Sequence, residues 1–245
     1  MHAPENFSFT DSSKTLLDRI HRNPFPSSCR DVLTQSILNR HGYSNTSMTG
    51  CPAWYSLDHI DLPFQTSTAV ESVAVSIGVK PKLIPQTFRL LKRIKRLFPR
   101  ATLYATYHHG LKKTDRLPAK LWVQTQLTRI FSESLGYRSL DLSGSVESMK
   151  IYDDCGLHVG YRVHAHINRL SQKKPSYLLC EDGRGLGLMR SLGTPDVDAY
   201  APDALDALIA SIDRNQRTAN RDFQAPHETM RTSFHAMKKF LSDLP

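Results

Sequence analysis

Apolar residues recur at helical spacing in several segments of the chain. From Pro85 to Phe98 they repeat every three or four positions, and basic residues fill the remaining face, which predicts a basic amphipathic helix. Helices are also expected at residues 13–22, 202–213 and 226–241. The last of these carries Phe234, Met237, Phe240 and Leu241 on one face.

Other segments have the pattern of strands. Residues 101–107 alternate apolar and polar side chains, and residues 146–152 and 176–180 are short runs of strand-forming residues. Residues 121–131 fit a helix or a strand equally well. Because strands and helices are interleaved without a regular repeat, we expect an α+β fold with a mixed β-sheet flanked by helices.

The first 60 residues differ in composition from the rest. They are rich in Ser, Thr, Asn and Pro, with turn signals at Asn23-Pro24 and Cys51-Pro52. The composition shifts near Asp61. The sequence therefore predicts a partly irregular N-terminal accessory segment, residues 1–60, and a main domain, residues 61–245.

Length and composition narrow the class of protein. A chain of 245 residues with 40% hydrophobic residues can bury one substantial core. It contains no run of roughly 18–20 apolar residues, as a membrane span requires, and its N-terminus has no secretory apolar run. We expect a soluble, cytoplasmic protein without a membrane partner. The four cysteines form no C-x-x-C pair, which favours reduced thiols.

The charge balance favours a phosphate-bearing partner. Lys and Arg number 32 against 23 Asp and Glu, a formal charge of +9, and such an excess attracts polyanions. Composition does not choose between a nucleotide and a nucleic acid. The basic helix at residues 85–98 fits either a solvated surface face or a phosphate contact.

A glycine-rich turn follows the expected strand at residues 176–180. Glycines alternate with other residues from Gly183 to Gly187, which lets backbone N–H groups approach an anion, and Arg184 adds a bidentate donor. The spacing satisfies neither the dinucleotide-binding G-x-G-x-x-G pattern nor the phosphate-loop ending G-K-[ST].

Three segments in order resemble the signature of the GTP cyclohydrolase II family. They are Arg129–Gly136 (R-I-F-S-E-S-L-G), Asp153–His158 (D-D-C-G-L-H) and Asp182–Leu188 (D-G-R-G-L-G-L). The family has R-V-H-S-E-C-L-T-G, C-D-C-G-x-Q and E-G-R-G-I-G-L. The resemblance implies a cyclohydrolase II-like core that binds a purine nucleoside triphosphate, GTP above all. It also implies a hydrolase related to riboflavin biosynthesis, which releases pyrophosphate, opens the imidazole ring, or does both.

The resemblance also implies roles for individual residues. Nucleotide binding falls to Arg129, Glu133, His158, Asp182, Gly183 and Arg184, and catalysis to Glu228, Arg231 and Tyr200. The three zinc cysteines of the family correspond to Ser134, Asp153 and Cys155, so one thiolate is retained. The cofactors implied are Zn²⁺ on these three positions and Mg²⁺ with the nucleotide.

Two alternatives remain open at this point. The first is a homologue that binds a nucleotide without catalysis. The second is a metal-dependent single-strand DNA nuclease, because His164-Ala165-His166 has its His-hydrophobic-His pattern; that requires a strand, in which alternate residues share a face. Nucleic acid is thus a secondary candidate partner. His108-His109 fits metal or phosphate binding as well as simple exposure, and a homodimer is compatible with the sequence.

Overall fold

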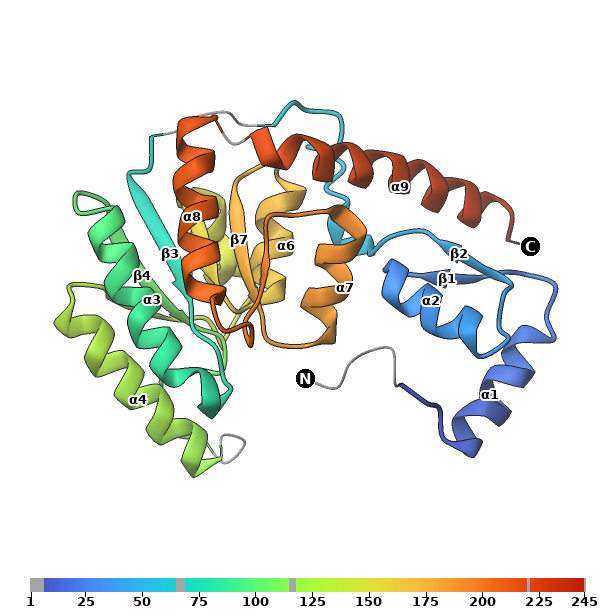
Figure 1. Ribbon diagram of the computed structural model, residues 1–245, viewed down its shortest axis with the longest axis horizontal. Coiled ribbons are helices and arrows are strands. Elements are labelled where there is room, and N and C mark those ends of the chain that lie inside the picture. Colours follow the sequence, from blue (N-terminus) through green and yellow to red (C-terminus); the bar gives the residue numbers. More distant parts are fainter. Residues whose placement is uncertain (1–6, 65–68, 115–117, 220, 245) are drawn as a thin grey trace.

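A parallel six-stranded sheet forms the centre of the molecule (Figure 1). The computed structural model describes residues 7–64, 69–114, 118–219 and 221–244. Across the sheet the described strands run in the order β5-β4-β3-β6-β7-β8, and every neighbouring pair is parallel. Their bounds are β3 (Ser72–Ser76), β4 (Thr102–Tyr107), β5 (Arg138–Asp141), β6 (Leu157–Gly160), β7 (Ser176–Cys180) and β8 (Val197–Asp198).

The expected mixed sheet is wrong in its strand directions, and the fold is α/β. Each helical crossover carries the chain back to the end of the sheet at which the previous strand began, so successive strands point the same way. Helices then cover both faces, and the strands lose the alternation that a one-sided sheet shows. All five residues of β7 are buried, as are all four of β6.

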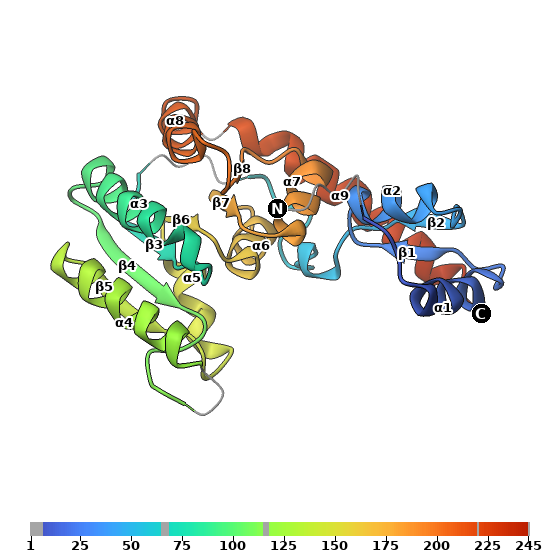
Figure 2. The same ribbon diagram turned by 60° about the horizontal axis from the view of Figure 1, so that its bottom comes forward.

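Helices flank the sheet on two sides. One layer contains α3 (Ile84–Leu97), which contacts both α4 (Ala119–Ser134) and α8 (Ala204–Arg217). The other contains α5 (Ile151–Asp154), α6 (Val163–Ser171) and α7 (Gly183–Leu192). Figures 1 and 2 show the two groups at opposite sides of the central strands. Val73 and Val75 of β3 belong to the main core with α3, whereas Ala74 packs in a second cluster with Tyr152 and Cys155.

Several sequence predictions hold in this fold. The helices expected at 13–22, 85–98, 202–213 and 226–241 are α1 (Asp11–His21), α3, α8 and α9 (Gln224–Ser242). The strands expected at 101–107 and 176–180 are β4 and β7, and the ambiguous 121–131 lies in α4. The strand at 146–152 is wrong. Its polar run closes into the 3₁₀ helix η4 (Glu147–Lys150), and the Ser148 hydroxyl donates to the Ser145 carbonyl at 2.6 Å.

The N-terminal segment packs against α6 and α7. It contains α1, α2 (Val32–Arg40) and a parallel pair of short strands, β1 (Ser27–Cys29) and β2 (Thr46–Met48). Helix α2 contacts α7, and the 3₁₀ helix η2 (Pro52–Trp54) contacts α6, burying Trp54. Figure 1 shows the segment beyond α7 and beneath α9. The proposed division near residue 60 stays a prediction.

The glycine-rich segment is the start of a helix rather than a turn. Asp182 caps α7 and accepts hydrogen bonds from the backbone N–H groups of Arg184 and Gly185 at 3.0 and 3.3 Å. A Cβ at Gly187 would lie 2.7–2.9 Å from the Asp31 carboxylate. Glycine at this position therefore lets α7 approach the N-terminal segment closely.

The basic helix α3 uses its charged face for packing. Arg93 pairs with Asp206 of α8, and the Lys92 ammonium lies over the Phe131 ring of α4, 5.5 Å from its centroid. Phe88 stacks on Phe131 at 4.2 Å. These contacts fit the interpretation of a surface helix. None of the described helices has the length and apolar character needed to cross a membrane.

A chain of buried polar side chains links the strands at the centre of the sheet. His158 of β6 is fully buried; its Nε2 lies 2.8 Å from the Ser76 Oγ of β3, and its Nδ1 lies 2.7 Å from the Ser176 Oγ of β7. The Arg162 backbone N–H donates to Ser76 Oγ at 3.1 Å. Three neighbouring strands and the turn after β6 are thereby connected through side chains.

The same chain continues to the loop before β8. Ser176 Oγ lies 2.8 Å from Nδ1 of His166, and Nε2 of His166 lies 3.0 Å from Oδ2 of Asp196. Asp196 also accepts from the Leu178 backbone N–H at 2.8 Å. One arrangement of protons satisfies the hydrogen bonds from Ser76 through His158 and Ser176 to His166 Nδ1, with each group donating toward His166, whereas the contact of His166 Nε2 with the Asp196 carboxylate is close but not aligned as a hydrogen bond.

The close approach of α7 to the N-terminal segment generates a first prediction. Gly187→Ala should lower the free energy of unfolding by about 1–3 kcal/mol, because the added methyl group meets the buried carboxylate of Asp31. Urea unfolding measures this change. Gly183→Ala on the same helix has no heavy atom within 4 Å of its new Cβ and should be neutral or stabilising. Equal effects of the two substitutions would contradict the packing account.

Buried histidines generate a second prediction, a loss of stability in acid. Burial lowers the pKa of His158 well below its usual value, and burial with nearby cations lowers the pKa of His108 and of His227 to about 3. Unfolded histidine titrates near 6.5, so below that pH the unfolded chain takes up protons that the folded chain refuses. These histidines should leave the free energy of unfolding unchanged above pH 6.5 and should lower it as the pH falls towards 3. At pH 5 the expected loss is about 2 kcal/mol per histidine relative to neutral pH.

A substitution isolates one of these groups. His227→Phe keeps an aromatic ring against Phe64 and Phe223 but binds no proton, so the melting temperature should fall less between pH 7 and pH 5 than in the wild type. The exposed His235→Gln serves as the control and should retain the wild-type slope. Parallel pH profiles for wild type and His227→Phe would refute the assignment.

Candidate functional site

The order of the strands reverses at the centre of the sheet. The chain runs outward through β3, β4 and β5, then crosses to the other side of β3 and continues through β6, β7 and β8. In open parallel sheets such a reversal leaves a crevice at the carboxyl ends of the two central strands, and ligands bind there. The crevice in this fold lies beyond the ends of β3 and β6.

Charged and imidazole side chains follow the ends of these strands. Each of β3, β4, β6 and β7 contributes at least one of them within four residues of its end. They are Lys80 after β3, His108 and His109 after β4, Arg162 and His164 after β6, and Glu181, Asp182 and Arg184 after β7. The phenol of Tyr200 follows β8. The topology therefore gathers residues that are far apart in the sequence at one edge of the sheet.

Gly160 determines how the chain leaves β6. Its φ of +147° suits glycine, and a Cβ there would lie 2.3 Å from the Ser76 carbonyl oxygen. The backbone of Tyr161 donates to that same carbonyl at 3.0 Å. The close approach of the two central strands thus directs Arg162 and the start of α6 to the crevice.

Arg162 and Glu181 form a partly satisfied ion pair at this edge. The Arg162 Nη1 lies 3.7 Å from Glu181 Oε1, with side-chain exposures of 13% and 5%. Burial raises the pKa of Glu181, although Arg162 opposes the shift. Arg162 Nε and Glu181 Oε2 are buried without a hydrogen-bond partner in the described residues. The two side chains therefore satisfy each other only in part.

Three histidines at the crevice are less basic than free histidine. Burial, followed by the charge of Arg162, lowers the pKa of His108 to about 3 and lowers the pKa of His109. Burial and the charges of Arg184 and Arg162 lower the pKa of His164. Each of the three imidazoles is therefore mainly neutral at pH 7 and can accept a proton.

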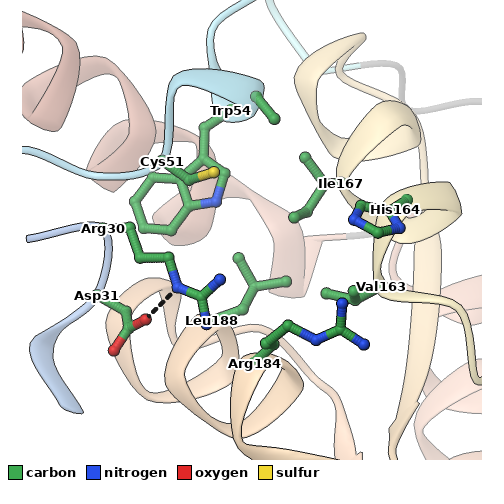
Figure 3. A pocket seen from close by; sticks show the side chains of 10 residues that line it. Arg30, Asp31, Cys51, Trp54, Val163, His164, Ile167, Arg184 and Leu188 are labelled. Carbon is green, nitrogen blue, oxygen red and sulfur yellow. Dashed lines mark hydrogen bonds and ion pairs between the residues drawn. The ribbon is translucent and has the colours of Figure 1, made fainter. Parts of the chain in front are cut away.

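A cavity of about 170 Å³ opens between α6, α7 and the N-terminal segment (Figure 3). Its lining side chains with polar ends are Arg30, Asp31, Cys51, Trp54, His164 and Arg184, and its apolar wall includes Leu188. Figure 3 shows the Arg30 guanidinium extending toward the space between Trp54 and Leu188, with His164 on the opposite wall. A cavity of this volume holds one small molecule.

The donors around this cavity are partly uncommitted. Asp31 accepts from Arg30 Nε at 2.9 Å, and Asp182 accepts from Nε and Nη2 of Arg184 at 3.1 and 2.7 Å. Each guanidinium therefore keeps further N–H groups. The indole Nε1 of Trp54 is buried and has no hydrogen-bond partner in the described residues. Together these groups suit a small ligand that carries acidic oxygens.

Two shallower hollows continue along the same edge. One, of about 370 Å³, is lined by Lys80, Lys82, Glu181 and Tyr200. The other, of about 390 Å³, lies between Lys80, His109 and α4. The edge thus offers a compact cationic cavity next to wider open surfaces, an arrangement suited to one small and one large substrate.

The residues assigned to nucleotide binding do not form one site. Arg129 and Glu133 form an exposed pair at 3.9 Å on α4, in the layer opposite α7. His158 lies inside the core, and Asp182 and Gly183 form the start of α7. Arg184 alone among the six lines the cavity of Figure 3.

The residues assigned to catalysis and metal binding are also separated. Tyr200 lines a hollow at the crevice, whereas Glu228 and Arg231 form an ion pair on α9 beside a different cavity. Ser134 ends α4, and Asp153 and Cys155 lie at the end of α5. No group of three or more potential metal-ligating His, Cys, Asp or Glu side chains occurs in the described ranges. The Zn²⁺ and Mg²⁺ predictions have no test here.

The nuclease alternative lacks its geometry. His164 and His166 lie on the helix α6, not on a strand, so they face different surroundings. His164 is exposed at the crevice, whereas His166 is fully buried beside Asp196. They cannot bind one metal ion together.

Sequence reasoning missed Arg30, Trp54, Lys80, Arg162 and Glu181. No short motif marks them, because they come from separate loops. Lys80, Arg162 and Glu181 share a position, since each follows the end of a strand of the central sheet, and Arg30 follows β1 of the two-stranded parallel pair. Recognising it requires the strand order, which local patterns do not provide.

Comparison with protein families overturns the resemblance to GTP cyclohydrolase II. The model of the family described as polysaccharide pyruvyl transferase matches residues 6–179, more than half of the chain. No curated protein matches the sequence. The three short segments lie in α4, around α5 and in α7, where they serve helix packing and capping.

The expectations that followed from that resemblance fall with it. GTP as the partner, hydrolysis as the reaction and a place in riboflavin biosynthesis are wrong, as are the silent nucleotide-binding homologue and the cyclohydrolase core. The expectation of an enzyme holds in the coarser sense that the matched family is one of transferases. On this match over residues 6–179, the chain belongs to the polysaccharide pyruvyl transferase family.

Proposed function

We propose that this protein transfers a pyruvyl group from phosphoenolpyruvate to hydroxyl groups of a saccharide. The family match supports the reaction class. The observation that carries the location is the cavity of about 170 Å³ between α6, α7 and the N-terminal segment, beyond the carboxyl ends of β6 and β7. It is lined by two guanidinium groups and by Trp54, whose indole N–H has no hydrogen-bond partner among the described residues. Its size suits the small donor rather than the saccharide.

The donor's charges match the cavity. Phosphoenolpyruvate carries a phosphate and a carboxylate close together, and guanidinium groups bind both in a bidentate manner. Arg30 and Arg184 approach the cavity from different elements, so each can take one anionic group (Figure 3). The Trp54 N–H adds a neutral donor.

The acceptor saccharide has room beside the donor. The hollow lined by Lys80, Glu181 and Tyr200 is wide and open, and its groups can both donate to and accept from sugar hydroxyls. Glu181 is held by Arg162 and has one buried oxygen without a partner. We assign this hollow to the sugar unit that receives the pyruvyl group.

The proposed reaction requires two hydroxyl groups of the acceptor. The oxygen of the first adds to C2 of the enol phosphate, and its proton ends on C3, so the methylene becomes a methyl group. The oxygen of the second displaces phosphate from C2 by cleavage of the C–O bond, and its proton leaves on the phosphate. The products are a pyruvate ketal and inorganic phosphate, and no oxidant or reductant is needed.

His164 is the proposed proton carrier. It lines the donor cavity, and its lowered pKa keeps the imidazole neutral, so it can take the proton of the attacking hydroxyl and return it to C3. Arg184 and Arg162 lower its basicity, which makes the imidazolium a stronger acid for the second half of this step.

Removing a guanidinium from the donor cavity should weaken donor use. Arg30→Met and Arg184→Met should each lower kcat/KM for phosphoenolpyruvate by about 10- to 100-fold, because each loses a charged hydrogen bond to an anion. Phosphate release with a saccharide acceptor measures this rate. Arg190→Met, an exposed change on the same helix as Arg184, should stay within about twofold. Unaltered rates in both cavity variants would refute the location.

Replacing the proton carrier should affect turnover more than binding. His164→Ala should lower kcat by about 10²- to 10⁴-fold with little change in the KM of the donor. In the wild type, kcat should decline on the acid side with an apparent pKa below 6.5, since a neutral imidazole is required and its pKa is lowered. If the residual kcat of His164→Ala declines at low pH in the same way as that of the wild type, His164 is not the proton carrier.

A further inference from the structure

A second cavity lies at the far end of α6 from the donor cavity. It is an open hollow of about 520 Å³, lined by residues 60–64, by Lys173 just beyond α6, and by the first turns of α9. Figure 1 shows the segment before β3 passing over the beginning of α9. Nothing in the proposed reaction uses this cavity.

Lys173 is held in the cavity wall by an unusual backbone conformation. Its φ is +61°, and in the described chain it shares a positive φ with one other non-glycine residue, Ala219. The residue is 4% exposed, yet its ammonium makes no hydrogen bond or ion pair in the described part. Burial lowers its pKa, with Asp61 opposing the shift. A lysine kept where glycine would be easier points to a use for its ammonium.

An aromatic plate forms another part of the wall. Phe64 stacks on His227 with ring centroids 4.6 Å apart, and Phe223 stacks on Phe64 at 5.5 Å. His227 is 6% exposed, and neither ring nitrogen makes a well-aligned hydrogen bond in the described structure. This part of the wall is therefore apolar, because the ring nitrogens of His227 are buried.

The charges of the cavity cancel. Lys173 and Arg231 are opposed by Asp61 and Glu228, and Arg231 holds Glu228 at 2.9 Å. A polyanion would gain little from such a set, whereas a sugar, whose hydroxyls both donate and accept, can use cations and carboxylates alike. We propose that this cavity is a second saccharide-binding subsite, which takes a neutral sugar unit of the acceptor away from its reacting end.

The two cavities lie close enough for one oligosaccharide. His164 lines the first cavity and Lys173 the second. The two residues are nine positions apart along α6 and its end, which corresponds to about 14 Å at helical rise. Residues 51–54 line the first cavity and residues 60–64 the second, so one segment walls both. The choice of a saccharide as the ligand rests on the proposed function, whereas the presence of the cavity is independent of it.

Two matched glycine substitutions test the subsite. Lys173→Gly removes the ammonium and relieves the positive φ, so the melting temperature should stay or rise while affinity falls about tenfold or more. Ala219→Gly gives the same backbone relief outside the cavity and should keep wild-type affinity. Titration calorimetry without donor uses cellotetraose, maltotetraose and galactotetraose as probes. Phe64→Leu, which removes the aromatic plate, should also weaken binding about tenfold.

The outcomes separate this inference from the proposed function. Wild-type affinity in both Lys173→Gly and Phe64→Leu, absence of millimolar binding of all three tetrasaccharides, or binding of inorganic phosphate in place of sugar at Lys173 would overturn the subsite. Binding that depends on Lys173 but no pyruvyl transfer would support the subsite and contradict the proposed reaction. Pyruvyl transfer together with tetrasaccharide binding that does not depend on Lys173 would support the proposed reaction and contradict the subsite.

Discussion

The buried polar chain from Ser76 to Asp196 is the interaction on which the rest of the structure depends. It connects β3, β6 and β7 through His158 and Ser176, and it extends through His166 to the loop before β8. These are the strands on either side of the reversal in strand order. A buried polar chain is costly unless its members have partners, and here the two hydrogen bonds of His158 also fix the relative heights of β3, β6 and β7.

The chain determines where the functional groups emerge. Ser76 accepts from the Arg162 backbone, and the neighbouring Gly160 brings β6 against the Ser76 carbonyl. Arg162 and His164 consequently leave the sheet beside Glu181 and Arg184. Most of the arginines at this edge form an ion pair with a carboxylate. The carboxylate holds the guanidinium group in place, and the remaining guanidinium N–H groups stay available as donors. Such an edge favours small dianions over extended polyanions, in line with a pyruvyl donor.

Local patterns predicted local structure well and the function poorly. The amphipathic helix α3 was evident because its apolar residues recur at a spacing of three or four, and β7 was evident as an apolar run between turns. The sheet's parallel direction was missed because strands buried on both faces lack alternation. The glycines from Gly183 to Gly187 resembled an anion-binding motif, but the role of Gly187 depends on Asp31, a residue more than 150 positions away in the sequence. His158 and Arg184 were both singled out, yet only the fold separates a core histidine from a cavity arginine.

The central claim is that the pyruvyl donor binds between Arg30, Arg184 and His164, in the cavity between α6, α7 and the N-terminal segment. A crystal structure of the protein with phosphoenolpyruvate tests it most directly. The account predicts electron density for the donor in this cavity, with its phosphate and carboxylate on the two guanidinium groups and C3 within reach of the His164 imidazole. Density for the donor in the cavity beside Lys173, or elsewhere on the surface, would contradict it.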